Sequence, residues 1–383
     1  MTSDTGLERC VGDPASFGAE VWGKRPLLHR SPDGFSDLLS LDDVDRLISS
    51  AGLRVPAFRL VQQGKILSPS GYTKTTRTGS QAATGVADAA AVFARFEAGA
   101  TIVLQGMHRY WSPVAGFARS LEVALGHPVQ VNAYVTPPGS QGFDLHQDDH
   151  DVFVLQSHGS KRWVVHDRND LPPTRAAVVE IDLGPGDSLY IPRNFPHAAA
   201  TQTSASVHLT IGVLSIGTKE VLEAALWLLE TDGELDEPLP VRFADDQQAL
   251  RATVDQRLDR IGELLVSKVD RDAVGGRLQR RFFTTRQPLL SGQMRRLLDL
   301  DQFTDQSWVE VRTGALCLLQ PEGDDLAVLL GDRELRMPAF MAPVMAQMLE
   351  RGRIRVGELR LDAESRMVLV RRLIKEGLLE VVG

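Results

Sequence analysis

A series of short β-type runs between residues 101 and 213 constrains the fold more than any other feature of the sequence. The runs are rich in Val, Ile, Leu and Thr, and they are separated by turn-forming clusters such as 137–140 and 184–187. Many short strands with regular turn signals are typical of sandwiches and barrels, so we expect a mainly β domain here. The predicted strands are 101–105, 129–136, 152–156, 162–166, 178–181, 188–191 and 207–213. Helices predicted at 42–52 and 86–98 would pack on its outside.

After Gly217 the pattern changes to apolar residues at helical spacing, interrupted by an acidic, proline-bearing linker at 232–240. Helices are predicted at 219–230, 245–269 and 292–300. A hairpin signal at 315–330 precedes two helical patterns and a closing strand, at 340–351, 362–376 and 378–382. We therefore predict three domains: a β domain with N-terminal helices (1–216), an all-α domain (217–300) and a winged-helix-like domain (301–383).

The composition is that of a globular protein, with 43% apolar and 24% charged residues among 383. It excludes wholesale disorder, a collagen-like fibre and a polytopic membrane protein. No run of 18 apolar residues occurs, and the N-terminal residues show neither the basic region nor the apolar core of a secretion signal. Cys10 and Cys317 lie 307 positions apart and do not form a disulfide framework. We expect a reducing, cytoplasmic environment and no membrane partner.

The charges are unevenly distributed along the chain. The net charge of −8 argues against a surface built for direct nucleic-acid binding. Residues 220–263 carry 12 acidic and 4 basic side chains, whereas 268–296 carry 8 basic and 2 acidic ones. These two segments could pair with each other, within the chain or across a dimer, or the basic one could face RNA or a ribosome.

Eight of the nine histidines lie between His108 and His208, and none follows. Structural histidines would be spread over the whole chain. The clustering indicates that metal or proton chemistry is located in the first 215 residues.

The most informative segment within that region is His146-Gln147-Asp148. In an extended chain, His146 and Asp148 point to the same face, which provides two of the three ligands of a 2-His-1-carboxylate metal site. His197 is the best candidate for the third, because it follows a predicted strand in a proline-bounded loop, 51 residues after His146. A lone histidine in such a position is more often a surface residue. The prediction therefore rests on finding both the 146–148 motif and His197 in the same β-rich region.

Neighbouring polar residues are assigned other roles. Asp149, His150 and Asp151 crowd the motif, but additional ligands would close positions that a reactive metal needs. We expect them to support the site or to lie on the surface. His208 lies within an apolar strand and is expected to be a core histidine.

Several motifs in this order resemble the Jumonji-C-type ribosomal oxygenases of the cupin superfamily. The resemblance begins with Trp-Gly-Lys-Arg-Pro-Leu-Leu at 22–28 and covers most of the chain. The further matching segments are 131–142, 146–148, 151–156, 159–163, 184–192 and 206–210. It implies a double-stranded β-helix (cupin/Jumonji-C) catalytic core, followed by an all-α dimerisation domain and a C-terminal winged-helix domain.

The resemblance also implies roles for particular residues. His146, Asp148 and His197 would bind Fe(II), and 2-oxoglutarate and O2 would be cosubstrates. Lys161, 15 residues after His146, falls where the family keeps a basic residue for the distal carboxylate of 2-oxoglutarate. A cation inside a barrel is costly unless it meets an anion, which agrees with that role. Asn132 and Tyr134, on one face of a strand, would hydrogen-bond the same cosubstrate.

The implied activity is hydroxylation of a protein side chain, an arginine or histidine of a ribosomal protein, by a homodimer. Two alternatives stay open at this point. The same core could act on a small molecule or a peptide natural product, since fold does not fix function. The chain could instead be a ligand-sensing DNA-binding regulator, although residues 307–383 carry 11 basic and 12 acidic side chains, a poor balance for phosphate neutralisation.

Overall fold

The computed structural model describes residues 5–140, 144–201 and 203–382. Gln141 and Gly142 of the family-like motif, and Phe143 beside them, lie outside the described residues. The chain divides into two compact units, one of residues 1–215 with 289–293 and one of 216–288 with 294–383. None of the described helices combines the length and apolar character needed to cross a membrane.

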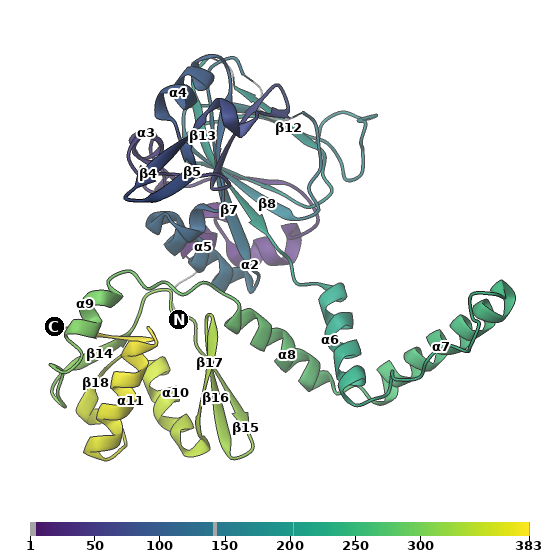
Figure 1. Cartoon of the computed structure of the whole chain (residues 1–383), viewed down its shortest axis with the longest axis vertical. Helices are drawn as coiled ribbons and strands as arrows, with labels where there is room; N and C mark the ends of the chain where they lie inside the picture. Colours follow the sequence, from purple (N-terminus) through teal and green to yellow (C-terminus); the bar gives the residue numbers. More distant parts are fainter. Residues whose placement is uncertain (1–4, 141–143, 202, 383) are drawn as a thin grey trace. The chain divides into compact units, whose positions relative to one another are not determined.

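The first unit is built on an antiparallel eight-stranded sheet and a smaller three-stranded one (Figure 1). The order in the large sheet is β1 (Leu27–Arg30), β11 (Asp187–Ile191), β8 (Asp151–His158), β13 (Ser206–Val213), β7 (Val129–Thr136), β6 (Thr101–Leu104), β2 (Phe58–Gln62) and β3 (Lys65–Ile66). The small sheet has the order β10 (Val179–Leu183), β9 (Lys161–Val165) and β12 (His197–Thr201). The predicted β domain is thus observed.

Strand β8 explains how the two sheets are joined. Its side chains alternate between two buried clusters, so the strand reads as a continuous apolar run. Phe153 and Leu155 belong to the main core of the unit, while Val152 and Val154 pack with Trp163 and residues of the small sheet. Burial on both faces fixes the register of β8, because a shift by one residue would exchange the two clusters.

Helices pack around this β core. Helix α3 (Leu41–Ser49) overlaps the predicted segment 42–52 and begins one residue before it. Helix α4 (Ala89–Glu97) lies within the predicted segment 86–98, whose start belongs to the strand β5 (Gln81–Ala87). Helix α5 (Ser112–Leu125) packs on α1 (Thr5–Val11) and β7, and the sequence patterns did not indicate it. It starts beside Pro113 and ends at Gly126, whose φ of +67° suits a glycine at a helix end.

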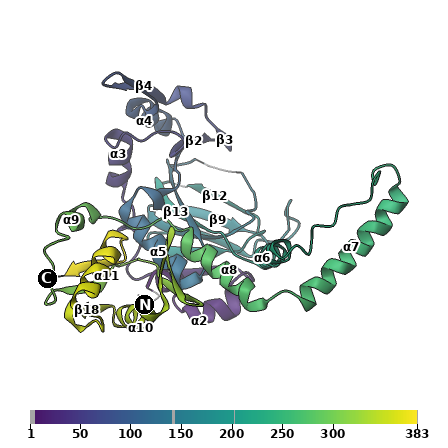
Figure 2. The same ribbon diagram turned by 60° about the horizontal axis from the view of Figure 1, so that its bottom comes forward.

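The second unit begins with the helices α6 (Thr218–Thr231), α7 (Gln247–Ser267) and α8 (Arg271–Thr284). Helices α6 and α8 pack through Ala224, Ala225 and Val274, and α7 extends as one long helix (Figure 2). Helix α8 was not predicted from the sequence. Its Arg280 pairs with Glu322 and Glu334, so part of the basic segment is neutralised within the chain.

Residues 294–383 have a core of their own around Val309, Met345 and Val370. Two three-stranded sheets, with orders β18-β14-β19 and β15-β16-β17, accompany the helices α9, α10 and α11. The elements are α9 (Gln293–Leu298), β14 (Trp308–Val311), β15 (Leu318–Glu322), β16 (Asp325–Leu330), β17 (Arg333–Pro338), α10 (Ala342–Arg351), β18 (Arg353–Arg355), α11 (Ala363–Lys375) and β19 (Leu379–Val382). The hairpin, the helices and the closing strand lie where the sequence places them.

Candidate active site

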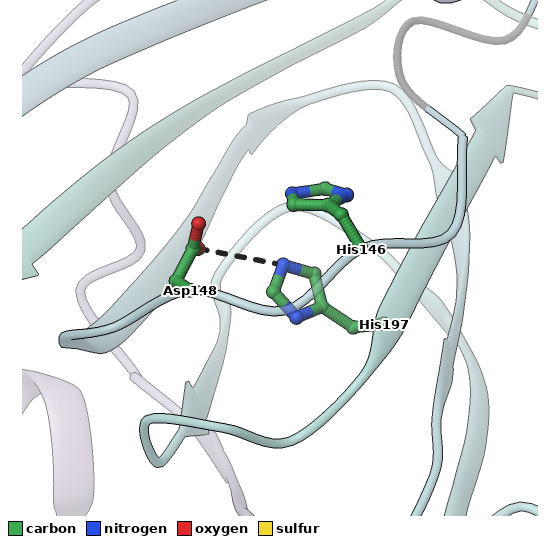
Figure 3. Close-up of side chains that lie close together, drawn as sticks. All are labelled: His146, Asp148 and His197. Atoms are coloured by element: carbon green, nitrogen blue, oxygen red, sulfur yellow. Dashed lines mark ion pairs between the residues drawn. The ribbon is translucent and has the colours of Figure 1, made fainter. Parts of the chain in front are cut away.

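Three side chains with metal-ligating atoms meet at one end of the β core (Figure 3). The ligand atoms of His146, Asp148 and His197 lie within 4.8 Å of one another. The Nε2 atom of His197 is 3.6 Å from Oδ2 of Asp148, and the two imidazole rings have centroids 4.5 Å apart. Among the residues that the structure describes, these three form a group that could hold a metal ion.

The segments that carry these residues are joined by their main chains. The amide of His146 donates to the carbonyl of His197 (3.2 Å), and the amide of His197 donates back to the carbonyl of His146 (2.8 Å). The amide of Asn194 donates to the carbonyl of Asp148 (2.8 Å). Residues 145–148 do not form a regular strand, contrary to the assumption of an extended run, but an isolated bridge places His146 opposite His197. His197 itself begins β12.

Both histidines are oriented in the same way. Nδ1 of His146 is 2.7 Å from the carbonyl of Asp144, and Nδ1 of His197 is 3.0 Å from the carbonyl of Phe195. A carbonyl only accepts, so each Nδ1 carries the proton and each Nε2 is the ring nitrogen that can ligate a metal. Burial lowers the pKa of His197, which favours the neutral form that a ligand needs. Two imidazole nitrogens and one carboxylate therefore fit the donor set of a 2-His-1-carboxylate centre.

A cavity of about 260 Å³ opens beside this group and extends into the β core. Its lining includes the three residues above together with Asn132, Tyr134, Lys161 and His208. Asn132 and Tyr134 come from β7, Lys161 from β9 and His208 from β13, so strands of both sheets line the cavity. The structure thus brings all six predicted site residues to one cavity.

Lys161 contributes a buried amine to that cavity, and we call the part of the cavity around it the inner end. The side chain of Lys161 is buried, with 4% of the residue exposed, and Nζ donates to Oγ1 of Thr136 at 3.3 Å. No ion pair with a described carboxylate accompanies it, and burial lowers its pKa to about 7. A buried amine with a single neutral partner is a place where an anion would be stabilised.

Asn132 and Tyr134 lie on the cavity face of β7, while Val131 and Ala133 enter the main core on the other face. The Oδ1 atom of Asn132 accepts a hydrogen bond from the amide of Gly106 (3.0 Å), which leaves its amide group for other partners. The ring of Tyr134 stacks on that of His208, with centroids 5.1 Å apart. Burial raises the pKa of Tyr134, so its hydroxyl stays protonated.

The sequence analysis did not assign Arg59 and His208 to the site, although both line the cavity. Arg59 lies on β2, a strand that was not predicted, and it hydrogen-bonds Tyr134. His208 is buried in β13 as expected of a core histidine, but it lines the cavity and its Nδ1 has no partner among the described residues. The sequence indicated a strand at His208 but not its pairing, and it is the register with Tyr134 across β13 and β7 that brings His208 to the cavity.

The residues around the motif separate by environment. The side chain of Asp149 is fully exposed, His150 lines the cavity, and Asp151 is buried at the start of β8. None of them belongs to the group of three ligands.

Residues 111–221 match the JmjC domain family. Human ribosomal oxygenase 1 is 31% identical over 256 residues, covering 61% of this chain and 38% of that protein. The bifunctional lysine-specific demethylase and histidyl-hydroxylase NO66 of Branchiostoma floridae is 27% identical and covers 94% of this chain and 53% of that protein. The chain thus spans about half or less of the length of these relatives.

The crystal structure of Escherichia coli ribosomal oxygenase YcfD superposes on the chain with a TM-score of 0.58 at 18% identity, covering 97% of this chain and 99% of that one. This likeness concerns the fold. Residues 111–221, which carry the three-residue group and most of the β core around it, thus match the JmjC domain family, and the chain is similar in sequence to ribosomal oxygenase 1 over 61% of its length.

Proposed function

We propose that the chain is an Fe(II)- and 2-oxoglutarate-dependent oxygenase that hydroxylates a protein side chain, an arginine or histidine of a ribosomal protein. The observation that carries the proposal is the presence, in one cavity, of a 2-His-1-carboxylate group and a buried lysine without a carboxylate partner among the described residues. Such a cavity offers a metal site and an anion site to a single dicarboxylate.

The relatives support this assignment. Structures of YcfD are described in complex with cobalt and 2-oxoglutarate, and with cobalt and succinic acid. The relatives at 27–31% identity are named ribosomal oxygenases or a histidyl-hydroxylase. A chain that shares their fold and carries the donor set described above is suited to the same class of chemistry.

In this proposal His146, Asp148 and His197 hold the iron through Nε2, a carboxylate oxygen and Nε2. When bound there, Fe(II) would supply dioxygen activation and the oxidation of a substrate C–H bond. The carbonyls of Asp144 and Phe195 orient the two histidines by accepting from Nδ1, so that each Nε2 faces the metal position.

Lys161 would bind the distal carboxylate of 2-oxoglutarate, with Thr136 holding Nζ in place. Asn132 and Tyr134, on the same strand as Thr136, would add hydrogen bonds to the same molecule. A carboxylate beside Nζ would raise the pKa of Lys161 from its value in the empty pocket and keep the amine charged.

We further infer roles for the rest of the chain, with domains at 1–216, 217–300 and 301–383. The helical segment would form a homodimer, since large apolar side chains such as Leu258 and Val266 on α7 are 61% and 79% exposed. The C-terminal segment would be a winged-helix-like module that helps to dock a ribosomal protein. Light scattering tests the dimer. The site of action would be the cytoplasm, where ribosomes are found.

The first test is succinate formation from 2-oxoglutarate by the purified chain, with and without Fe(II). We expect iron-dependent succinate, lost in His146→Ala and retained in His158→Ala, which alters an exposed histidine at the end of β8. Binding of Fe(II) and 2-oxoglutarate is measured in parallel, because strict coupling to the prime substrate could suppress turnover. Absence of turnover and of both binding events would contradict the proposal. Incubation with ribosomal proteins, followed by mass spectrometry for a gain of one oxygen, then identifies the substrate.

A further inference from the structure

The loop 192–197 carries His197 and binds the main chain of Asp148. Within the loop, the described main-chain hydrogen bond is that from the amide of Phe195 to the carbonyl of Pro192. Asn194 has a φ of +65°, an uncommon conformation for a residue other than glycine. Its amide binds the carbonyl of Asp148, and the carbonyl of Phe195 orients His197. The spacing of two metal ligands therefore depends on how this loop is fixed from outside.

A buried carboxylate fixes one side of the loop. Asp151 is 1% exposed, and its Oδ1 accepts hydrogen bonds from the hydroxyl of Tyr190 (2.7 Å) and the amide of Arg193 (3.4 Å). Its Oδ2 accepts from the hydroxyl of Ser215 (2.9 Å). One side chain thus connects the start of β8, the end of β11, the loop and the residue beyond β13.

The network continues to the N-terminal motif at 22–28. The amide of Gly23 donates to the hydroxyl of Tyr190 (2.9 Å), which in turn donates to Asp151. The indole ring of Trp22 stacks on Tyr190, with centroids 5.9 Å apart. Gly23 has a φ of +66°, which suits glycine and turns the chain so that its amide faces the ring hydroxyl.

The carbonyl of the same glycine supports the loop from a second direction. Arg168 donates to the carbonyl of Gly23, and its guanidinium lies 5.4 Å from the centroid of Phe195. Phe195 is 4% exposed and packs with residues of β8, β9 and β11. The amide of Gly23 is therefore connected through Tyr190 and Asp151 to Arg193. The carbonyl of Gly23 is connected through Arg168 to Phe195, at the other end of the segment 193–195.

From this geometry we infer that Asp151 is a positioning residue for the metal centre, and that it acts together with the Trp22–Gly23 turn by setting the loop that spaces Asp148 and His197. The inference rests on the proposed metal site. Asp151 touches neither the metal nor the cosubstrate. It acts through the Arg193 amide and the Tyr190 hydroxyl, and the Gly23–Arg168–Phe195 contacts provide the second support.

The test is the affinity of the metal-free, full-length protein for Co²⁺, measured by calorimetry and by the visible absorption of the bound ion. Substitutions behind metal ligands usually weaken binding by about 10–100-fold, and we expect Asp151→Ala to fall in that range with an altered Co²⁺ spectrum. Asp151→Asn keeps an acceptor for Tyr190 and Arg193 and a donor for Ser215, so it should restore most of the affinity. A residue that served stability alone would lower the melting temperature and leave the affinity and the spectrum of the folded protein unchanged.

Tyr190→Phe provides a milder test, with Tyr72→Phe as its matched control. Both hydroxyls are buried in the same core, but no described contact links Tyr72 to the loop. We expect Tyr190→Phe to weaken Co²⁺ binding and Tyr72→Phe to leave it unchanged. If Asp151→Ala does not fold, this pair decides the question.

Wild-type affinity in Tyr190→Phe, or in folded Asp151→Ala, would overturn the inference while leaving the proposed function intact. Failure of the wild-type protein to bind Co²⁺ would instead overturn the proposed metal site.

Discussion

The two ends of the cavity are built in different ways. At the metal end, His146 and Asp148 lie outside the regular strands and His197 is only the first residue of β12, so an isolated bridge, a few main-chain hydrogen bonds and an external network hold the three together. At the inner end, Lys161, Thr136 and Tyr134 lie on paired strands whose register fixes them. Substitutions around the inner end should therefore leave its geometry unaltered, whereas the metal affinity of the metal end should respond even to distant substitutions. The following experiments test this difference, starting with the largest effect.

Asp148→Ala should abolish metal binding and leave the inner end unaltered. Removing one of three ligands leaves two neutral imidazoles, which cannot balance the charge of a divalent ion. We expect a loss of Co²⁺ affinity greater than about 100-fold, beyond the range seen for residues behind the ligands. Asp149→Ala is the matched control, since that neighbouring carboxylate is fully exposed. Equal losses in the two variants would contradict the assignment of Asp148.

Lys161→Met should impair the inner end and leave the metal end unaltered, the reverse of what is expected for Asp148→Ala. A hydrogen bond to a charged group contributes about 1.5–3 kcal/mol, so the KM for 2-oxoglutarate should rise by about 10–100-fold. The affinity for Co²⁺ alone should stay within a factor of two of wild type, because His146, Asp148 and His197 do not contact Lys161 by any described interaction. A parallel loss of metal affinity would show that the two ends are coupled and would contradict the comparison.

The pH dependence of the free energy of unfolding, measured without 2-oxoglutarate, should also reflect Lys161. Its pKa is about 7 in the folded chain, against 10.5 for a free lysine. The unfolded chain therefore binds more protons between these values, and the stability contributed at this position increases as the pH rises from 7 to 10.5. Below pH 7 both states are protonated and the full cost of the buried charge is present.

Urea unfolding at pH 6 and pH 9 checks this sign. Lys161→Met should be more stable than wild type at pH 6, and the difference should shrink at pH 9. In addition, 2-oxoglutarate binding at pH 8 should take up a proton, visible as a dependence of the binding enthalpy on the buffer. A stability difference that does not change with pH would mean that burial does not lower the pKa of Lys161, so that the amine keeps its proton in the folded chain at both pH values.

The smallest effect is expected for Thr136→Val. This isosteric change removes the hydroxyl that accepts from Nζ of Lys161 at 3.3 Å. A neutral partner contributes about 0.5–1.5 kcal/mol, so 2-oxoglutarate affinity should fall by about 2–10-fold with metal affinity unchanged. Isothermal titration against both ligands measures the two values. A larger loss than in Lys161→Met would reassign the anion site to the threonine.

The sequence indicated all three metal ligands, and at the inner end it indicated Asn132, Tyr134 and Lys161. Asn132 and Tyr134 share a face by alternation along the predicted strand 129–136, whereas Lys161 precedes the predicted strand 162–166 and was assigned from the family resemblance. Arg59 was missed because its strand, Phe58–Gln62, lacks a clear pattern, and β12 was missed because Ala198, Ala199 and Ala200 have little β propensity. The proximity of His146 to His197 was inferred from motif order, but the bridge between them joins residues 51 positions apart and has no local signal.

The second unit was predicted less evenly. Helices α6 and α7 follow regular apolar spacing, and their existence could be inferred. Helix α8 contains Gly275, Gly276 and several arginines, so its pattern is weak. Its place is set by contacts that sequence periodicity does not record, such as Arg280 with Glu322 and Glu334 and Arg277 over the ring of Trp227.

The mutual main-chain bridge between His146 and His197 has a consequence for how the protein acquires its metal. Two peptide groups, rather than the ion, join the ligand-bearing segments, so the ordering entropy of the site is paid during folding. Loading and loss of the metal should then be reversible on the native protein, without partial unfolding. The amide hydrogen of His197, which donates at 2.8 Å, should exchange slowly with solvent even before any metal is bound.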